Sequence, residues 1–116
     1  MDIVRKSDKR RHKRLGVTYQ VSYRLKDSTH SYNMSRTKNI SRGGMLLSVN
    51  TPYPAGTWLT LLVRLPFLMQ PVEVAGEVLS SREMVKGSLY EVRIRFSSES
   101  QERLGGLDEF IKRRAD

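Results

Sequence analysis

Arg10 and Arg14 are two arginines spaced four residues apart within the cationic run Arg10-Arg11-His12-Lys13-Arg14. Arginine carries a planar fork of N–H donors that can bind a phosphate, or the O6 and N7 atoms of guanine, with two hydrogen bonds. On a helical turn the two side chains would share a face, and on an extended arm they would also point to one side. The spacing therefore indicates a grip on two parts of one anionic ligand.

A second group of polar residues follows in the segment Asn39-Ile40-Ser41-Arg42-Gly43-Gly44. Asn39 and Ser41 are two residues apart at the end of a predicted strand, so their side chains should leave the same face. An amide beside a hydroxyl can hydrogen-bond both a base edge and a phosphate oxygen. The pair Gly43-Gly44 permits positive φ and lets a ligand approach the backbone N–H groups closely. We expect this segment to form the other half of the same site.

The distribution of charge points to an anionic partner. The chain has 116 residues, with 21 Lys and Arg against 12 Asp and Glu, and a formal net charge of +9. Residues 1–14 hold seven of the cations and two acidic residues, a net charge of +5. Such a segment repels itself and has few apolar residues to bury, so residues 1–15 are predicted to be a flexible basic arm. At this level nucleic acid, acidic lipid and a small phosphorylated ligand all remain open.

Composition excludes several other classes. There is no cysteine, so neither a disulfide framework nor a thiolate metal site is available. His12 and His30 lack acidic neighbours at ligand spacing, and we expect no metal and no cofactor. The chain has no Ser/His/Asp set and no Gly-Lys-Ser/Thr phosphate loop, so we do not expect an enzyme. No apolar stretch approaches the roughly 20 residues of a spanning helix, and the charged N-terminus does not resemble a signal peptide. A cytoplasmic protein without membrane insertion is expected.

Period-two alternation predicts an all-β domain. Val17, Tyr19, Val21, Tyr23 and Leu25 alternate with polar residues, as in a half-buried strand. Similar signals, separated by turn residues, recur along the chain. The predicted strands cover residues 17–26, 32–38, 45–49, 57–65, 72–80 and 90–96. Six short strands of this kind favour a closed antiparallel β-barrel over residues 16–97, which leaves no exposed sheet edge.

The end of the chain changes to helical spacing. Leu104, Leu107, Phe110 and Ile111 recur near a period of 3.6, which predicts a C-terminal α-helix over residues 98–114. The segment Ser98-Glu99-Ser100-Gln101 fits a capping box at its start. The glycines in Gly105-Gly106 each weaken a helix by roughly 1 kcal/mol relative to alanine, and a break at this pair is the alternative. We expect this helix to cover one end of the barrel, and residues 1–116 to form a single domain.

Both motifs, in this order and among barrel-type strands, resemble the PilZ domain family. The signature of that family is R-x-x-x-R on an N-terminal arm and [DN]-x-S-x-x-G at the start of a barrel strand. Here these motifs read Arg10-x-x-x-Arg14 and Asn39-x-Ser41-x-x-Gly44, with no departure at a signature position. The resemblance extends from about Lys9 to Ile111. It implies a six-stranded barrel that binds the bacterial second messenger cyclic di-GMP.

The resemblance also implies a role for each motif residue. Arg10 and Arg14 would contact guanine and phosphate from the arm, Asn39 and Ser41 would contact a guanine edge and a phosphate from the barrel, and Gly44 would allow close approach. Four neighbouring residues are secondary candidates for ligand contact: Lys9, Arg11, Arg42 and Gly43. In this family the position of Lys9 can influence whether one ligand or a stacked pair is bound, so stoichiometry is left open.

The charge of the arm suggests how such a receptor would respond. A dianionic cyclic dinucleotide would remove the repulsion among the arm cations and bridge the arm to the barrel, and the rearranged surface would regulate a partner protein in trans. Two alternatives stay open: a small basic barrel that binds nucleic acid, and a ligand-silent PilZ adaptor. No aromatic-and-basic stripe lies on one predicted strand face, which makes nucleic acid the weaker choice.

Overall fold

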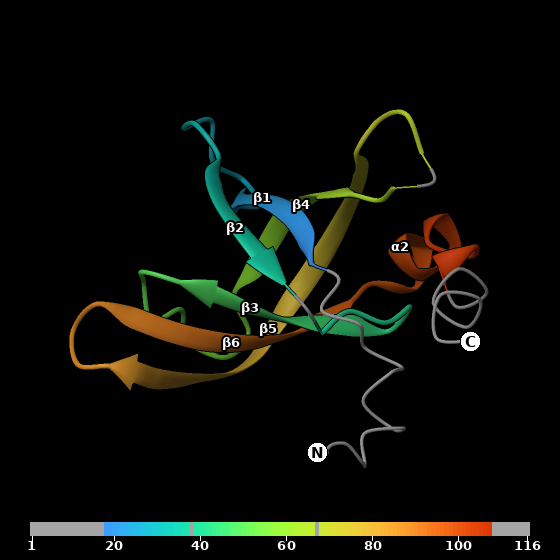
Figure 1. Ribbon diagram of the computed structural model, residues 1–116. Helices are drawn as coiled ribbons and strands as arrows, with labels where there is room; N and C mark the ends of the chain where they lie inside the picture. Colours follow the sequence, from blue (N-terminus) through green and yellow to red (C-terminus); the bar gives the residue numbers. More distant parts are fainter. Residues whose placement is uncertain (1–17, 38, 67, 108–116) are drawn as a thin grey trace, which may run out of the picture.

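The computed structural model describes residues 18–37, 39–66 and 68–107. Within these residues the chain forms six strands and a short helix, shown in Figure 1. The elements are β1 (Tyr19–Leu25), β2 (Asn33–Thr37), β3 (Gly44–Val49), β4 (Trp58–Arg64), β5 (Val72–Val85), β6 (Leu89–Phe96) and α2 (Ser98–Arg103).

All six strands belong to one antiparallel sheet with the order β2-β1-β4-β5-β6-β3. The sheet curls until its two end strands, β2 and β3, lie next to each other (Figure 1). Side chains of β2 close the gap: the Ser35 hydroxyl donates to the Ser48 carbonyl at 2.7 Å, and the Thr37 hydroxyl donates to the Leu46 carbonyl at 2.6 Å. The prediction of a six-stranded antiparallel barrel is confirmed, and the barrel is nearly closed.

The core fills the inside of the barrel because each strand turns every second side chain inward. In β1, Tyr19, Val21 and Tyr23 are buried, as their alternation predicted. The other inward residues follow the same rule along β3, β4, β5 and β6. They are Met45, Leu47, Val49, Leu59, Leu61, Val63, Val74, Val78, Val92, Ile94 and Phe96. Burial of this apolar surface is the main stabilising contribution to the fold.

Strand β5 is longer than its predicted extent of residues 72–80, because it continues to Val85 and forms an extended hairpin with β6. Figure 1 shows this hairpin reaching away from the barrel, on the side opposite α2. Residues 79–89 are all exposed, so they carry no alternation between buried and solvated positions. That is why the hydrophobic pattern could not mark the extension. The ladder between β5 and β6 contains irregularities between Val78 and Ser80 and between Glu83 and Val85.

Helix α2 begins at Ser98, as predicted, but its N-cap is one residue earlier than the predicted capping box. The N-cap is Ser97, whose Oγ accepts a hydrogen bond from the Ser100 N–H at 3.2 Å, so the Ser98-to-Gln101 capping box is wrong. The helix ends at Arg103, and residues 104–106 form a turn at the glycine pair. The predicted continuation beyond residue 107 lies outside the described residues. No helix in the described part of the chain is long and apolar enough to cross a membrane.

The buried hydroxyl of Ser100 attaches α2 to the barrel. It accepts a hydrogen bond from the Ala75 N–H in β5 at 2.8 Å, while the Ala75 carbonyl accepts one from the Ser97 N–H at 3.0 Å. Leu104 and Leu107, which follow the helix, are buried in the same core cluster. The start of the helix is therefore fixed relative to β5 and to the end of β6.

Candidate functional site

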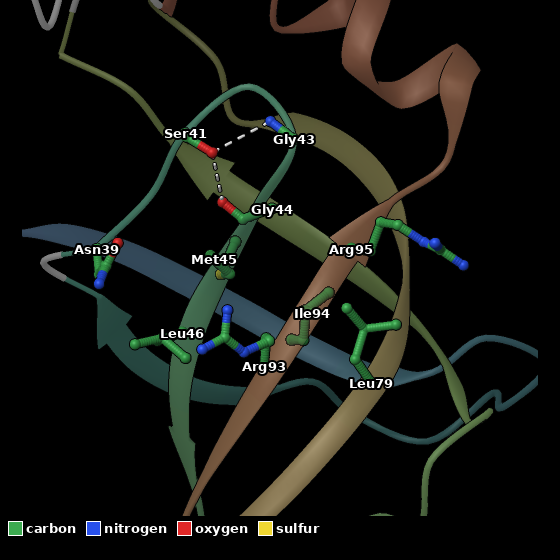
Figure 2. Close-up of a pocket in the computed structure, with 10 residues that line it drawn as sticks. All are labelled: Asn39, Ser41, Gly43, Gly44, Met45, Leu46, Leu79, Arg93, Ile94 and Arg95. Carbon is green, nitrogen blue, oxygen red and sulfur yellow. Dashed lines mark hydrogen bonds between the residues drawn. The ribbon is translucent and has the colours of Figure 1, made fainter.

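The segment between β2 and β3 folds into a tight turn whose hydrogen bonds fix the signature residues. Asn39 and Leu46 begin and end this turn, since the Leu46 N–H donates to the Asn39 carbonyl at 3.0 Å. Within it, the Ser41 N–H donates to the Gly44 carbonyl at 2.9 Å, and the Gly43 N–H donates to Ser41 Oγ at 3.2 Å. Ser41 thus caps its own turn and holds its hydroxyl near the backbone of Gly43, as Figure 2 shows.

Gly44 is required by the barrel itself. A Cβ at this position would lie 2.1 Å from the Ile94 carbonyl oxygen and 3.3 Å from Arg95 Cα. Only glycine therefore lets β3 begin its ladder against β6, where Gly44 is opposite Arg95 and Leu46 is opposite Arg93. Neither Gly43 nor Gly44 has the positive φ that the sequence analysis allowed for. The close approach at Gly44 in the structure is between two strands.

A pocket of about 290 Å³ lies at this junction of the signature turn with β3, β5 and β6. Its polar lining comes from the turn and from two arginines of β6, and its apolar lining comes from β3, β5 and β6 (Figure 2). The residues that line it are Asn39, Ser41, Gly43, Gly44, Met45, Leu46, Leu79, Arg93, Ile94 and Arg95. A pocket that combines amide, hydroxyl and guanidinium groups with an apolar wall can hold a polar ring and an anionic group together.

The structure brings together four of the predicted site residues and separates a fifth from them. Asn39, Ser41, Gly43 and Gly44 all line the pocket. Arg42 does not line it, because its Nε donates to the Gln101 carbonyl of α2 at 3.2 Å. The predicted arm residues lie outside the described part of the chain: Lys9, Arg10, Arg11 and Arg14.

Sequence reasoning missed the β5 and β6 side of the pocket. The local pattern of residues assigns no site role to Arg93, Arg95 or Leu79. The available signal was that two cations two residues apart must leave the same face of a strand. What the sequence did not provide was the pairing of that strand with β3, which places these arginines beside the signature turn.

The two arginines differ in their partners. Arg95 forms an ion pair with Glu77 of β5, with 3.0 Å between Nη2 and Oε1, and this pair is partly exposed. Within the described residues Arg93 has no ion pair or hydrogen bond from its side chain. Considering the described residues alone, the pocket therefore offers one guanidinium that is shared with a carboxylate and one without a protein partner. No three His, Asp or Glu side chains gather as a metal site would require, in the part of the chain that the structure describes.

The fold and the pocket define a small antiparallel β-barrel with a polar site on its outer wall. A protein-family model of the PilZ domain matches residues 8–113, and the chain belongs to this family. The match spans both signature motifs, including the arm residues that lie outside the described part of the chain. A comparison with curated protein sequences found no match.

Solved structures with a similar fold include two longer proteins. One is the inhibitor of motility MotI/DgrA of Bacillus subtilis, with 18% identity, a TM-score of 0.62, and coverage of 84% of this chain and 47% of that protein. The other is MrkH of K. pneumonia in its apo state, with 17% identity, a TM-score of 0.65, and coverage of 85% and 48% respectively. This chain thus spans about half the length of each structure. At these identities the similarity concerns the fold.

Proposed function

We propose that this protein is a cyclic di-GMP receptor that binds its ligand between the Arg10-x-x-x-Arg14 arm and the outer pocket of the barrel. The observation that carries the proposal is the position of the [DN]-x-S-x-x-G motif. Its Asn39, Ser41 and Gly44 line one wall of a pocket that also contains two arginines. Membership of the PilZ family supports a nucleotide ligand for this site.

The chemistry of the pocket suits such a ligand. The side-chain amide of Asn39 is exposed and has no hydrogen bond to the described residues, so it can meet the edge of a base. The hydroxyl of Ser41 accepts from the Gly43 N–H at 3.2 Å and donates a long bond of 3.5 Å to the Gly44 carbonyl, so it retains one lone pair for a further partner. Arg93 and Arg95 add positive charge that favours a dianion.

The basic arm supplies the remaining contacts in this proposal. Its net charge of +5 over residues 1–14 would be partly offset by the two negative charges of the ligand phosphates, so the arm folds onto the barrel when the ligand binds. Arg10 and Arg14 then contact guanine and phosphate opposite Asn39 and Ser41. The surface formed by the arm, the ligand and the barrel acts on a partner protein in trans.

Isothermal titration with cyclic di-GMP tests the proposal. We expect saturable binding that GTP does not reproduce, and at least a tenfold loss of affinity in Arg10→Ala, since a charge-assisted hydrogen bond contributes about 1.5–3 kcal/mol. Arg5→Ala removes the same charge from the arm outside the motif and serves as the matched control. A loss of less than about twofold in Arg10→Ala, at the error of such titrations, would remove Arg10 from the site.

A test variant and a control variant also examine the barrel half of the site. Asn39→Ala should weaken binding by about tenfold without a change in stability, whereas Asn33→Ala, an exposed asparagine at the start of β2, should leave binding unchanged.

NMR amide signals of residues 5–14 should shift on titration with the dinucleotide. An arm whose signals do not move at saturating ligand would contradict the proposed folding of the arm onto the barrel.

A further inference from the structure

Arg93 and Arg95 leave the same face of β6 but reach opposite sides of the pocket. Figure 2 shows the Arg93 guanidinium beside Leu46, on the side of Asn39, whereas Arg95 points away from Asn39. Arg95 is bound to Glu77 at 3.0 Å. Arg93 lies opposite Leu46 in the β3–β6 ladder and has no acidic partner among the described residues. Among the described residues, Arg93 is therefore the one of the two whose donors have no protein partner, and it lies on the side of the signature residues.

The neighbours of Arg93 across the sheet are Leu46 of β3 on one side and Ser80 of β5 on the other. Leu46 is half-buried beside Arg93, and Leu79 of β5 lines the same pocket with 39% of its surface exposed. Leu79 reaches the pocket because the β5–β6 register shifts there: Val78 is opposite Ile94 and Ser80 is opposite Arg93, so Leu79 has no opposite residue. A bulge of this kind redirects a side chain. The Arg93 guanidinium therefore lies beside the half-buried Leu46, and the exposed Leu79 lines the pocket on the other side of Ile94 (Figure 2).

We infer that Arg93 is a guanine-reading residue of this site, which binds the O6 and N7 atoms of one base while Leu46 and Leu79 contact the base. The inference rests on the proposed function and adds to it a basis for choosing guanine. This part of the pocket combines apolar side chains with a hydrogen-bond donor. A flat base suits it, because the face of the ring covers the apolar side chains and its edge accepts hydrogen bonds. A phosphate would leave the leucines in water and gain nothing from them.

The choice of base follows from the donors of arginine. Guanine presents two acceptors, O6 and N7, on one edge, and a guanidinium binds both. Adenine presents N7 beside the N6 amino donor, so the same fork makes one hydrogen bond and faces an unfavourable N–H. Arg93 should therefore favour cyclic di-GMP over cyclic di-AMP, with cyclic GMP–AMP between them.

Competition binding of the full chain with these three dinucleotides tests the inference. We expect Arg93→Ala to lose roughly tenfold to a hundredfold in affinity for cyclic di-GMP, and much less for cyclic di-AMP, so that the selectivity ratio shrinks by a similar factor. Arg93→Lys keeps the charge and can still donate to O6 and N7 but lacks the planar fork, so it should recover only part of the affinity for cyclic di-GMP that Arg93→Ala loses. Arg64→Ala, at an exposed end of β4 outside the pocket, is the control for removal of one surface charge.

Two outcomes would overturn the inference. They are an unchanged affinity in Arg93→Ala and an equal loss for all three dinucleotides. An equal loss would identify a phosphate or general charge contact instead. If the wild-type chain binds none of the dinucleotides, the proposed function itself is contradicted. If the wild-type chain binds cyclic di-GMP and Arg93→Ala binds it equally well, only the role of Arg93 is contradicted.

Discussion

The hydroxyl of Thr37 donates a 2.6 Å hydrogen bond to the carbonyl of Leu46, and this bond joins the two ends of the sheet. The same hydroxyl oxygen accepts a hydrogen bond from the Asn39 N–H at 3.1 Å. One buried side chain thus closes the barrel and fixes the residue that begins the signature turn. Leu46 and Asn39 both line the candidate pocket, so barrel closure and the geometry of the site depend on one group.

Thr37→Val should therefore destabilise the protein and weaken its ligand binding together. The substitution keeps the shape of the side chain but leaves the Leu46 carbonyl and the Asn39 N–H without this partner in a buried region, at a cost of about 1–3 kcal/mol in the free energy of unfolding. Urea denaturation followed by tryptophan fluorescence measures the loss, and a dinucleotide titration measures the effect on the pocket. Thr60→Val, at a half-buried position of β4, is the matched control.

A result in which Thr37→Val and Thr60→Val are equally stable would show that the hydroxyl does not close the barrel. The circular dichroism spectrum of each variant at low urea checks that both remain folded.

The strands that could be predicted are those with one buried and one solvated face. Tyr19, Val21 and Tyr23 alternate with polar residues because β1 has the core on one side only. The end of β5 could not be predicted, because both of its faces are exposed. The N-cap was misplaced by one residue because serines stand at both 97 and 98, and the choice between them depends on the contact of Ser100 with Ala75 of β5.

For the site, sequence predicted the residues that form a local motif and missed those that arrive through strand pairing. Asn39, Ser41 and Gly44 lie within six positions of each other, so their spacing alone indicated a common function. Arg93 reaches the same pocket only because β6 pairs with β3, which lies more than 40 residues earlier in the chain. Long-range pairing of this kind has no signal in the local pattern of residues.

Gly44→Ala should be much more damaging than Gly43→Ala, although the two glycines are adjacent. A Cβ at Gly44 would lie 2.1 Å from the Ile94 carbonyl oxygen, and a backbone atom can move only if β3 and β6 separate. At Gly43 the nearest atom would be Ser41 Oγ, at 3.9 Å. We expect Gly44→Ala to lose about 1–3 kcal/mol or more of stability, and Gly43→Ala to stay within about 0.5 kcal/mol of wild type.

Thermal unfolding of the two variants under identical conditions checks this difference. Hydrogen exchange at the amides of β3 should rise in Gly44→Ala alone. Equal melting temperatures for the two variants would mean that the contact between Gly44 and Ile94 does not require glycine.

Ser100→Ala should release α2 from the barrel. Ser100 is 2% exposed, and its hydroxyl oxygen accepts the Ala75 N–H at 2.8 Å, so alanine leaves a buried donor unsatisfied. We expect a loss of about 1–3 kcal/mol in the free energy of unfolding and faster exchange of the amides of residues 99–104. Ser98→Ala, at the exposed first residue of the same helix, should change neither quantity appreciably. Slow exchange that persists in Ser100→Ala would show that other contacts hold the helix.

Stability should also decline at alkaline pH through a pair of tyrosines. Tyr23 and Tyr53 meet edge to face, with ring centroids 6.5 Å apart. Burial raises the pKa of both phenols above the ordinary value of 10.0, and the charge of Tyr53 raises the pKa of Tyr23 further. A raised pKa in the folded state means that the folded protein holds these protons more tightly than the unfolded chain does. The stabilisation is therefore complete below pH 10 and is lost as the pH rises through the folded-state pKa values.

Urea denaturation at intervals from pH 8 to pH 11.5 measures this decline, with Tyr53→Phe as the comparison. Phenylalanine keeps the ring contact and removes one titrating group together with its charge, so the variant should lose stability less steeply above pH 10 than wild type. The difference in the free energy of unfolding between the two proteins should be constant up to about pH 9 and should then shift in favour of the variant. A difference that stays constant over the whole range would mean that ionisation of Tyr53 costs the folded state nothing.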